Sequence, residues 1–486
     1  MAKTAVLLIG GNDPQGCAGL AVDIQTVAMH GCHAIPLMTA LTEQTQAGLH
    51  ALGALSVTQF MKQYHACVAD FSLAGIKIGL IPNQAIAEAI VTILRLHPDI
   101  PVIYDPVMAA SSGGAAVDGD QYLSFCQKIL PYVTVITPNL IELSHLTGQN
   151  VTDVLSWRHA AEQLIQKGVK ACLVKGGHAD ETDWVVDHYL DQQHAFYCYQ
   201  QRLDYSVRGT GCILASSLCC YLSLGEDVRE AVVRARIYLS YGFRHAKPIG
   251  PYHVFTAHMQ QYDFADIPKL CYEPSQIGQR YQFAPCVDRL GIYPVVENSR
   301  WVNRLLAAGI DTIQLRMKSK TVAEYRDEIV TALSYCRSNT RFFVNDHWSL
   351  AIELGAYGVH LGQEDLHIAP LEKIAAAGLR LGVSTHSYWE LARALAVNPS
   401  YIAFGPIFET NSKVMPFQPQ GVDKVSQWVD CLAGHYPLVA IGGIDVARAK
   451  QLKKTQVGSV AMISAITQAE NYQQVCHQLL TLWEDG

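Results

Sequence analysis

The sequence lacks the features that mark membrane, disulfide-rich and nucleic-acid-binding chains. It has no run of 18 apolar residues, the length that a membrane-spanning helix needs. Its 14 cysteines contain no Cys-x-x-Cys pair, which argues against a disulfide framework or a zinc site. The formal net charge is −7 with histidine neutral, so no overall basic field favours nucleic acid.

The composition indicates packed domains in a reducing compartment. Half of the 486 residues are hydrophobic and 16% are charged, which is typical of globular proteins. The opening MAKTAVLLIGGNDP has one lysine and a very short apolar run, so it predicts a first strand rather than a signal peptide. We expect a cytoplasmic protein that binds neither membranes nor nucleic acid, with two to four domains by length.

The pattern of expected strands and helices differs between the two halves of the chain. In the first half, strands alternate with helices, which predicts a mostly parallel sheet covered on both faces. After residue 286, eight strand–helix units follow one another, which is the count for a (β/α)8 TIM barrel. The expected domains are residues 1–262 and 287–486, joined by a linker at 263–286. The expected strands are 4–10, 33–38, 74–78, 101–104, 133–136, 171–174, 185–190 and 195–200, then 290–296, 312–315, 342–344, 358–361, 381–383, 401–404, 439–441 and 460–462.

Polar residues and glycines follow several strands of the first half. In an open α/β sheet, ligands bind beyond the carboxyl ends of the strands, so these loops should share one cleft. The sharpest signal is Arg208-Gly209-Thr210-Gly211-Cys212 before a helix of small residues. The N–H groups at such a helix start can hold an anion, although a lone GTG turn is more often a tight loop.

The first half resembles the hydroxymethylpyrimidine and phosphomethylpyrimidine kinases of the ribokinase-like family. The resemblance covers about residues 1–260 and rests on motifs in family order, which are GGNDPQGCAGLAVDIQT, KIG, DPVM, TPNLIE, KGGH and GTGC. It implies a three-layer α/β/α fold. It also implies ATP-dependent phosphorylation of 4-amino-5-hydroxymethyl-2-methylpyrimidine and then of its monophosphate.

The kinase resemblance assigns roles to individual residues. The substrate residues would be Asp23 and Gln44, whose amide can both donate to and accept from the pyrimidine edge. A thiol at a helix N-terminus has a lowered pKa, so Cys212 would act either as a base or only by position. The other implied residues are Asn139 and Glu142 toward Mg²⁺, Lys175 and Gly177 on the nucleotide side, and Gly209 and Gly211 around the transferring phosphoryl group.

Two departures from the kinase pattern leave alternatives open. Arg208 stands where the family usually has histidine, and Ser111 stands where it usually has lysine. Arg208 could compensate for the missing lysine, or the kinase half could be slow or selective for one of its steps. The further alternative is a degenerate, non-catalytic pyrimidine-binding domain.

In the second half, a carboxylate follows each of two neighbouring expected strands. Asp346 comes after one and Asp365 after the next. Neighbouring parallel strands lie about 4.8 Å apart, so the two acids could meet and bind Mg²⁺, which usually takes only one or two protein carboxylates. The alternative is that both are solvated loop or helix-cap residues. Polar groups and glycines follow the other strands as well, at Gln314, Arg316, Lys318, Asn345, Ser384, Thr410, Asn411, Ser412, Lys413, Gly443, Ile463 and Ser464.

This half resembles thiamine phosphate synthase over about residues 288–484, through QLRMK, FFVNDHW, YGVHLGQEDL, GVSTHS, FGPIFETNSK, AIGGI and ISAI. The resemblance implies coupling of the pyrimidine pyrophosphate to thiazole phosphate, with Mg²⁺ on Asp346 and Asp365. Pyrimidine and pyrophosphate contacts would come from Gln314, Arg316, Lys318, Asn345, Ser384 and Lys413. The thiazole phosphate site would include Thr410, Asn411, Ser412, Gly443, Ile463 and Ser464.

Together, the two resemblances predict a bifunctional enzyme of thiamine biosynthesis whose partners are small-molecule substrates. A rival for the barrel is a thiazole tautomerase, which would not need the paired acids with the Gln-Arg-Lys set. A homo-oligomer is suggested only by analogy with both families.

Overall fold

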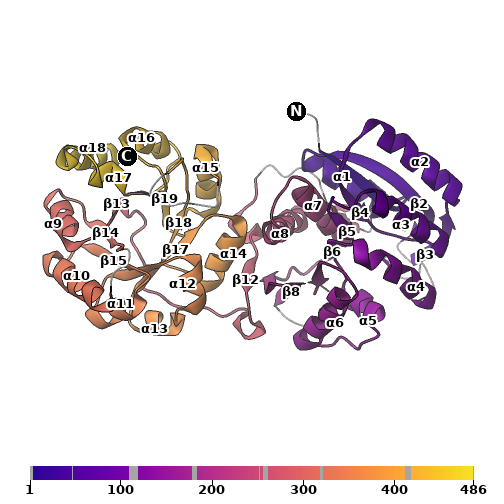
Figure 1. Cartoon of the computed structure of the whole chain (residues 1–486), viewed down its shortest axis with the longest axis horizontal. Coiled ribbons are helices and arrows are strands. Elements are labelled where there is room, and N and C mark those ends of the chain that lie inside the picture. Colours follow the sequence, from indigo (N-terminus) through magenta and orange to yellow (C-terminus); the bar gives the residue numbers. More distant parts are fainter. Residues whose placement is uncertain are drawn as a thin grey trace. The chain divides into compact units, whose positions relative to one another are not determined.

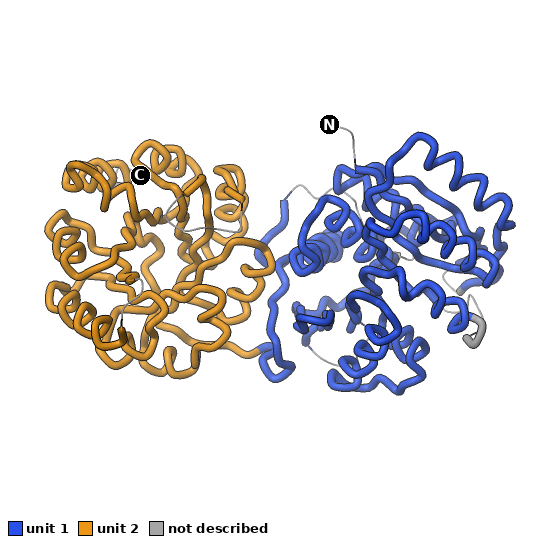
Figure 2. The backbone as a smooth tube through the Cα atoms, viewed as in Figure 1, with its two compact units in different colours: residues 1–278 blue, residues 279–486 orange. Residues whose placement is uncertain are grey.

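The computed structural model describes residues 4–45, 48–108, 119–177, 183–250, 252–255, 261–317, 321–410 and 418–484. It divides into two compact units, Met1–Gly278 and Gln279–Gly486 (Figure 2). Among the described residues, no helix is both long enough and apolar enough to cross a membrane.

In the described part of the first unit, one ten-stranded sheet has the order β12-β9-β8-β7-β6-β5-β4-β1-β2-β3 (Figure 1). The strands from β7 to β2 in this order are parallel, and β3, β8, β9 and β12 are antiparallel to their neighbours. The bounds are β1 (Ala5–Asn12), β2 (His33–Thr45), β3 (Gly48–Ala54), β4 (Leu73–Ile78), β5 (Val102–Tyr104), β6 (Val135–Ile136), β7 (Ala171–Lys175), β8 (Trp184–Asp191), β9 (Ala195–Gln201) and β12 (Lys269–Cys271), with β10 (Lys247–Ile249) and β11 (Tyr252–Val254) in a separate hairpin.

Helices cover both faces of this sheet. Helices α2 to α6 share one apolar core with the strands, while α1, α7 and α8 pack on one another and on β1, β4 and β5. Helix α3 shows how the local sequence produces such a helix. Asn83 caps it by accepting from the Ile86 N–H at 3.0 Å, and Ile86, Ile90 and Ile93 line its buried face. The bounds are α1 (Gly19–Met29), α2 (Val57–Asp70), α3 (Gln84–Leu96), α4 (Gly119–Ile129), α5 (Leu140–Thr147), α6 (Val154–Gln166), α7 (Thr210–Ser223) and α8 (Val228–Arg244).

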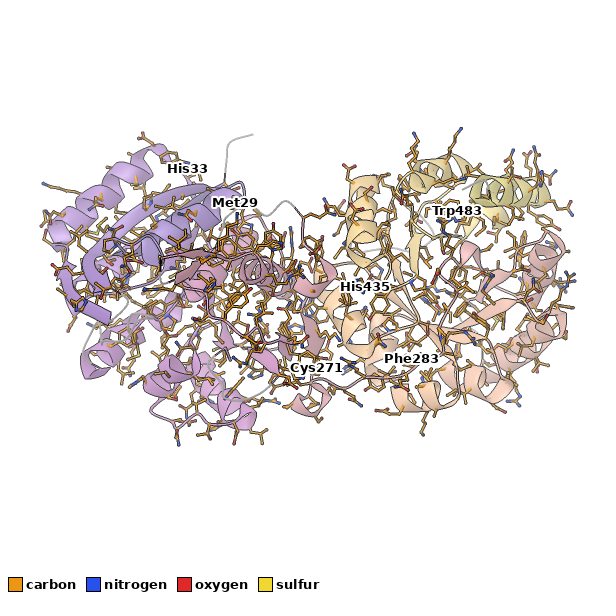
Figure 3. All side chains as sticks on the ribbon, turned by 180° about the vertical axis from the view of Figure 1, so that it is seen from behind. Met29, His33, Cys271, Phe283, His435 and Trp483 are labelled. Carbon is orange, nitrogen blue, oxygen red and sulfur yellow. The ribbon has the colours of Figure 1, made fainter. Side chains whose placement is uncertain are left out.

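The connection toward the second unit is more ordered than its sequence indicated. It contains the short 3-10 turns η2 (Phe264–Asp266) and η3 (Pro274–Gln276), whereas a third such turn, η1 (Leu130–Tyr132), lies between α4 and β6. Strand β12 lies between η2 and η3 and pairs with β9. It ends at Cys271, which is labelled in Figure 3. The domain limits at residues 262 and 287 stay a prediction.

In the second unit, eight parallel strands of the described chain close into a barrel in sequence order, as predicted. Strand β13 pairs with both β14 and β20, which completes the ring. The bounds are β13 (Gly291–Val296), β14 (Thr312–Leu315), β15 (Arg341–Asn345), β16 (Gly358–Leu361), β17 (Arg380–Thr385), β18 (Tyr401–Phe404), β19 (Leu438–Ile441) and β20 (Ser459–Met462).

The barrel interior is filled by side chains rather than open. Tyr293, Phe343 and Tyr401 pack together with Val439 and Ala461 at its centre. Helices follow the strands, as Figure 1 shows around the orange and yellow ring. Their bounds are α9 (Ser299–Ala307), α10 (Val322–Tyr335), α11 (Trp348–Leu354), α12 (Gln363–Ile368), α13 (Leu371–Ala376), α14 (Tyr388–Val397), α15 (Gly421–Leu432), α16 (Val446–Lys453), α17 (Ser464–Thr467) and α18 (Tyr472–Glu484). Both expected folds, the three-layer α/β/α domain and the barrel, are confirmed.

Candidate active sites

The first candidate site lies where two glycine turns meet beyond the carboxyl end of β1. Gly19 starts α1 with φ +59°, and a Cβ there would lie 2.4 Å from the carbonyl oxygen of Gly11. Gly209 precedes α7 with φ +75°, and its Cβ would lie 2.5 Å from the carbonyl oxygen of Cys17. A side chain fits at neither position, so only glycine allows the starts of α1 and α7 to approach the loop after β1 this closely.

Two buried lysine–carboxylate pairs lie beside these turns. Lys77, at the end of β4, donates to both oxygens of Asp23 at 2.8 and 2.9 Å. Lys175, at the end of β7, donates to Asp105 at 2.7 Å. Although burial opposes it, the Asp23 charge raises the pKa of Lys77, and the Asp105 charge likewise raises the pKa of Lys175. Both lysines therefore carry their charge within the site.

Lys175 also approaches the cap of α5. Its Nζ lies 3.8 Å from Oε2 of Glu142. Glu142 and Asn139 form a capping box, in which the Asn139 N–H donates to Glu142 at 2.7 Å and the Glu142 N–H donates to Asn139 at 2.8 Å. Burial raises the pKa of Glu142 to about 7, against the opposing charge of Lys175. The capping box thus places a carboxylate that titrates near neutral pH beside a fixed cation.

The GTG turn faces the Lys175–Asp105 pair. A Cβ on Gly211 would lie 3.1 Å from the Lys175 Nζ and 3.4 Å from Asp105 Oδ2. One residue on, burial raises the pKa of the Cys212 thiol to about 12, although Lys77 opposes the rise. The lowered thiol pKa that we expected at this helix start is therefore wrong, because loss of hydration and the charges of Asp23 and Asp105 outweigh the Lys77 charge and the hydrogen bond with the Gly19 backbone.

Three more residues singled out in the first unit have contacts of their own. Gln44 is part-buried on β2, opposite Leu49 of β3. Gly177 is exposed beyond β7, and Arg202 donates to its carbonyl oxygen at 2.9 Å. Arg208 lies in a small cavity with Cys17 and Gln25. Ser111 falls outside the described residues.

Sequence reasoning gave no role to Lys77 or Asp105. Both stand in motifs that were recognised, KIG and DPVM, at the end of a strand. A lysine or an aspartate directly after an apolar strand was the available signal, but their partners lie 54 and 70 residues away in the chain.

The second candidate site lies at the carboxyl ends of the barrel strands, around two acids. Asp346 follows β15 in a left-handed conformation with φ +62°, which costs a residue with a side chain about 1–3 kcal/mol and is typical of functional sites. Its N–H donates to the His360 carbonyl at 2.9 Å. Burial, together with the charge and hydrogen bond of Asp365, raises the pKa of Asp346 to about 6. The two acids therefore meet, as predicted for a strand-end pair.

The acid pair fits a hard cation that needs few protein ligands. The described residues contain no group of three or more His, Cys, Asp or Glu side chains placed to hold a metal ion together, so a site would have to rest on fewer protein ligands. Mg²⁺ usually takes one or two protein carboxylates and completes its shell with water and substrate phosphate. The Asp365 charge repels the Asp346 charge and so raises the pKa of Asp346, and a bound divalent cation would relieve that repulsion.

A hydrogen-bonded chain crosses the barrel interior below the acids. Ser384 Oγ lies 2.8 Å from Nε2 of His360, whose Nδ1 lies 2.7 Å from the Tyr401 hydroxyl. That hydroxyl contacts the Tyr293 hydroxyl at 2.9 Å, which accepts from the Gln314 amide at 3.2 Å. The chain therefore joins two predicted substrate residues, Ser384 and Gln314, on opposite sides of the interior.

His360 was missed in the sequence. It stands within the apolar strand Gly358–Leu361, where a histidine is unexpected, and that was its only signal. Burial lowers its pKa to about 3, so the ring is neutral and one nitrogen donates while the other accepts. His386, by contrast, is engaged outside the interior, with Nδ1 2.7 Å from Glu390.

Glycine lets two neighbouring strand-end loops of the barrel meet. Gly443 follows β19 with φ +64°, and a Cβ there would lie 2.3 Å from the carbonyl oxygen of Glu409. Thr410 is the next residue after Glu409. Ile463 is the N-cap of α17, which starts at Ser464. Both residues come directly after β20, the strand whose Ala461 pairs with Ile441 of β19. The predicted thiazole phosphate residues within the described chain thus follow adjacent strands.

Two glutamines that the sequence did not single out hold the loops in place. Gln363 donates to the Ser384 carbonyl at 2.7 Å. Gln420 donates to the carbonyls of His386 and Gly405 at 2.8 and 2.9 Å.

Arg316 and Asn345 are at the mouth, since the Arg316 charge lowers the pKa of Asp346 and the Asn345 amide donates to its carboxylate. Lys318, Asn411, Ser412 and Lys413 fall outside the described residues.

The two halves of the chain match different families. A model of phosphomethylpyrimidine kinase matches residues 13–257, and one of thiamine monophosphate synthase matches residues 292–466. The chain is 52% identical over 195 residues to thiamine-phosphate synthase of Citrobacter koseri, covering 40% of this chain and 92% of that protein. It is 51% identical over 202 residues to thiamine-phosphate synthase of Escherichia coli O1:K1, covering 41% and 95%.

The first unit also resembles solved kinase structures. Pyridoxal kinase from Staphylococcus aureus in complex with pyridoxal matches with a TM-score of 0.51 and 22% identity, over 56% of this chain and 100% of that one. The same kinase in complex with ADP matches with a TM-score of 0.51 and 22% identity, over 56% and 99%. At this identity the match supports the fold and nothing finer.

Proposed function

This chain belongs to the phosphomethylpyrimidine kinase family through its first unit and to the thiamine-phosphate synthase family through its second, and we propose that the two sites described above carry the corresponding reactions. The enzyme is bifunctional. It phosphorylates 4-amino-5-hydroxymethyl-2-methylpyrimidine and its phosphate with ATP, and it couples the pyrimidine pyrophosphate with thiazole phosphate to give thiamine phosphate and pyrophosphate.

The observation that carries the kinase site is Lys175 beside Gly211 at the start of α7. The backbone N–H groups from Gly209 to Cys212 would hold the transferring phosphoryl group at the positive end of the helix. Lys175 would neutralise charge on the nucleotide. Phosphoryl transfer needs mainly positioning and charge stabilisation, so a thiol that stays protonated does not prevent the reaction. Cys212 then acts by position.

The observation that carries the synthase site is the Asp346–Asp365 pair above the Ser384–His360 contact. Gln314 and Asn345 would orient the pyrimidine, and Arg316 and Ser384 would contact the departing pyrophosphate. The carbon–oxygen bond to pyrophosphate breaks, the pyrimidine methylene is left as a stabilised cation, and the thiazole nitrogen attacks it. No strong base is needed, which agrees with the neutral His360.

Mg²⁺ is the metal that both sites would take. Asp346 and Asp365 would hold it in the barrel, and Asn139 and Glu142 would orient it through water in the kinase unit. When bound, it supplies positive charge for phosphate oxygens. ATP is the proposed phosphoryl donor, because the first unit belongs to the phosphomethylpyrimidine kinase family. Gln44 and Asp23 would lie on the pyrimidine side.

We propose a cytoplasmic enzyme whose partners are its small-molecule substrates. All 14 cysteines are free, which supports a reducing compartment. Self-association stays a prediction by analogy.

The two partial reactions test the assignment separately. Purified protein with MgATP and either hydroxymethylpyrimidine or its phosphate should release ADP. With ready-made pyrimidine pyrophosphate and thiazole phosphate, it should release pyrophosphate. Loss of the first reaction alone would support a degenerate pyrimidine-binding domain, and loss of the second would overturn the synthase site.

A further inference from the structure

Residues 175–177, at the end of β7 and directly after it, are held from three sides. Lys175 reaches Asp105 and Glu142 with its side chain. The backbone N–H of Gly176 donates to Asp187 Oδ1 at 3.1 Å, and the carbonyl of Gly177 accepts from Arg202 at 2.9 Å. We call residues 175–177 the KGG segment. Each of its residues has its own anchor, and only the anchors of Lys175 lie in the site described above.

Asp187 is the anchor that the proposed reaction does not use. It stands on β8 directly opposite Lys175 in the antiparallel ladder, so the two side chains share a face of the sheet. Its side chain is 2% exposed. Oδ2 forms an ion pair with Nε of Arg236, on α8, at 3.2 Å, which leaves Oδ1 for the Gly176 N–H.

The path of the KGG segment leaves little room for another arrangement. A Cβ on Gly176 would lie 2.0 Å from the carbonyl oxygen of Val186 and 2.8 Å from the Trp157 ring. The strand therefore passes against β8 on one side and α6 on the other. If the Gly176 N–H lost its acceptor, it would be a buried donor without a partner, which costs about 1–3 kcal/mol. The segment would then shift toward solvent and take Lys175 with it.

Arg236 holds the Asp187 carboxylate in place through their ion pair. Beyond this ion pair with Asp187, its Nη2 donates to Oε1 of Gln200 at 3.4 Å, and the Gln200 amide donates to the Asp266 carbonyl at 2.8 Å. The arginine compensates the Asp187 charge, since a buried carboxylate is costly without a partner. A purely structural reading would assign the whole network to tying α8, β9 and η2 together. That reading predicts no specific effect on either substrate.

We propose that Asp187 is a positioning residue for the nucleotide, which holds the Gly176 N–H and thereby fixes where Lys175 meets the start of α7. The proposal rests on the proposed kinase function, in which the KGG segment lies on the ATP side. Asp187 touches neither substrate. It acts by keeping the Lys175 ammonium beside Asp105 and Gly211.

A matched pair of double variants isolates this hydrogen bond. Asp187→Asn with Arg236→Met keeps an oxygen that can accept from Gly176, and Asp187→Ala with Arg236→Met removes it. Neither leaves a buried charge, so both should fold, because replacing both partners of a buried ion pair is often close to neutral. Asp191→Ala is the control on the same strand, where the carboxylate accepts from Tyr189 and from the turn at Gln193.

We expect the Ala/Met variant to have a KM for ATP, and a calorimetric dissociation constant for MgATP, about tenfold above those of the Asn/Met variant. The KM for the pyrimidine should stay within about twofold. Asp191→Ala should leave ATP affinity unchanged. Synthase turnover with ready-made pyrimidine pyrophosphate, measured on the same chain, should be equal in all variants.

Equal ATP affinity in the two double variants would overturn the proposal, as would equal losses for ATP and for the pyrimidine. The binding measurement does not depend on turnover. If the wild-type chain bound MgATP without phosphorylating the pyrimidine, the kinase assignment would fail while the difference between the two variants still decided the role of Asp187. A wild-type chain that binds no ATP would overturn both.

Discussion

The two sites of this chain hold buried negative charge in opposite ways. In the first unit, Asp23 and Asp105 each accept from a lysine, at 2.8 and 2.7 Å. In the barrel, Asp346 and Asp365 face one another, and the pKa of Asp346 rises to about 6 through burial and that neighbour. The kinase site contains its own compensating cations, whereas the synthase site has a charge arrangement that a bound cation would complete.

This difference has a physical consequence for each unit. Removing a lysine from the first site leaves a carboxylate buried without its partner, which destabilises the fold. Removing an acid from the barrel site relieves repulsion and should cost the fold little. The same kind of substitution, loss of one charge, should therefore destabilise the first unit but not the barrel, while it strongly lowers activity in both.

The largest effect is expected for Lys175→Met. Asp105 loses its 2.7 Å partner, so the first unit should lose about 3 kcal/mol of unfolding free energy, and ADP release should fall about a hundredfold or more. Urea unfolding and the ADP assay measure these. Lys170→Met, at an exposed lysine beside the same strand, is the control. An unchanged unfolding midpoint would show that the ion pair does not stabilise the unit.

Asp346→Asn tests the same comparison in the barrel, where loss of a charge should lower activity without lowering stability. Synthase turnover should fall about a hundredfold, with no loss of stability, because a repulsive charge is removed and asparagine tolerates the left-handed backbone. Thermal unfolding and pyrophosphate release check this, with the exposed Asp327→Asn as control. A clear fall in unfolding temperature would mean that the acid pair stabilises the barrel rather than strains it.

His360 tests whether the barrel interior orients the substrate. His360→Phe removes the contacts to Ser384 and Tyr401, so kcat/KM for the pyrimidine pyrophosphate should fall about tenfold. His360→Gln, which keeps a donor and an acceptor, should lose less. Because burial holds the pKa of His360 near 3, neither variant should shift the pH profile between pH 5 and 8. A shift would contradict the neutral, positioning role.

Glu142 should contribute a distinct part of the pH dependence of the first unit. Burial raises the pKa of Glu142 from 4.5 to about 7 in the folded state. Between these values the Glu142 carboxyl binds more protons in the native state than in the unfolded state, so its contribution to stability is largest at low pH and falls as pH rises toward 7. His30 and His188, whose pKa values burial lowers to about 4, contribute in the opposite direction. Kinase kcat/KM should rise over the same range, if ionised Glu142 orients Mg²⁺. Glu142→Gln should remove the falling contribution, so the variant should gain stability relative to the wild type as pH rises from 4.5 to about 7. A stability difference that does not change over this range would exclude Glu142 as a titrating group.

The smallest effect is expected for Cys212→Ser. A thiol with its pKa raised by burial to about 12 is protonated at neutral pH, so it is no base. Kinase turnover should fall by less than about tenfold, whereas loss of a general base removes about 10² to 10⁴. A loss in that larger range, measured by ADP release, would restore the catalytic role.

Local patterns predicted most of the fold. Apolar runs ending in polar or glycine residues located the barrel strands to within a residue or two, because each strand is buried on both faces. Strand β3 (Gly48–Ala54) was missed because its glycines and alanines have low strand propensity. Strand β12 was missed because its three residues form a strand only by pairing with β9, far back in the chain.

The sites were predictable only in part. Strand-end position identified Lys175, Asp346 and Asp365 without any tertiary information. The partners of Lys77 and Asp105 depend on contacts between distant segments, and no periodicity carries that information. For Cys212, the helix start was identified correctly, but its pKa depends on burial that appears only once α1, β4 and β5 surround it.

The most direct test of the account is a single reaction with the purified chain, hydroxymethylpyrimidine, MgATP and thiazole phosphate. The account predicts thiamine phosphate, with two ADP and one pyrophosphate released for each molecule formed, because two phosphorylations precede one coupling. Thiamine phosphate that forms only from ready-made pyrimidine pyrophosphate would contradict the kinase half, and none from either mixture would contradict the assignment of the barrel.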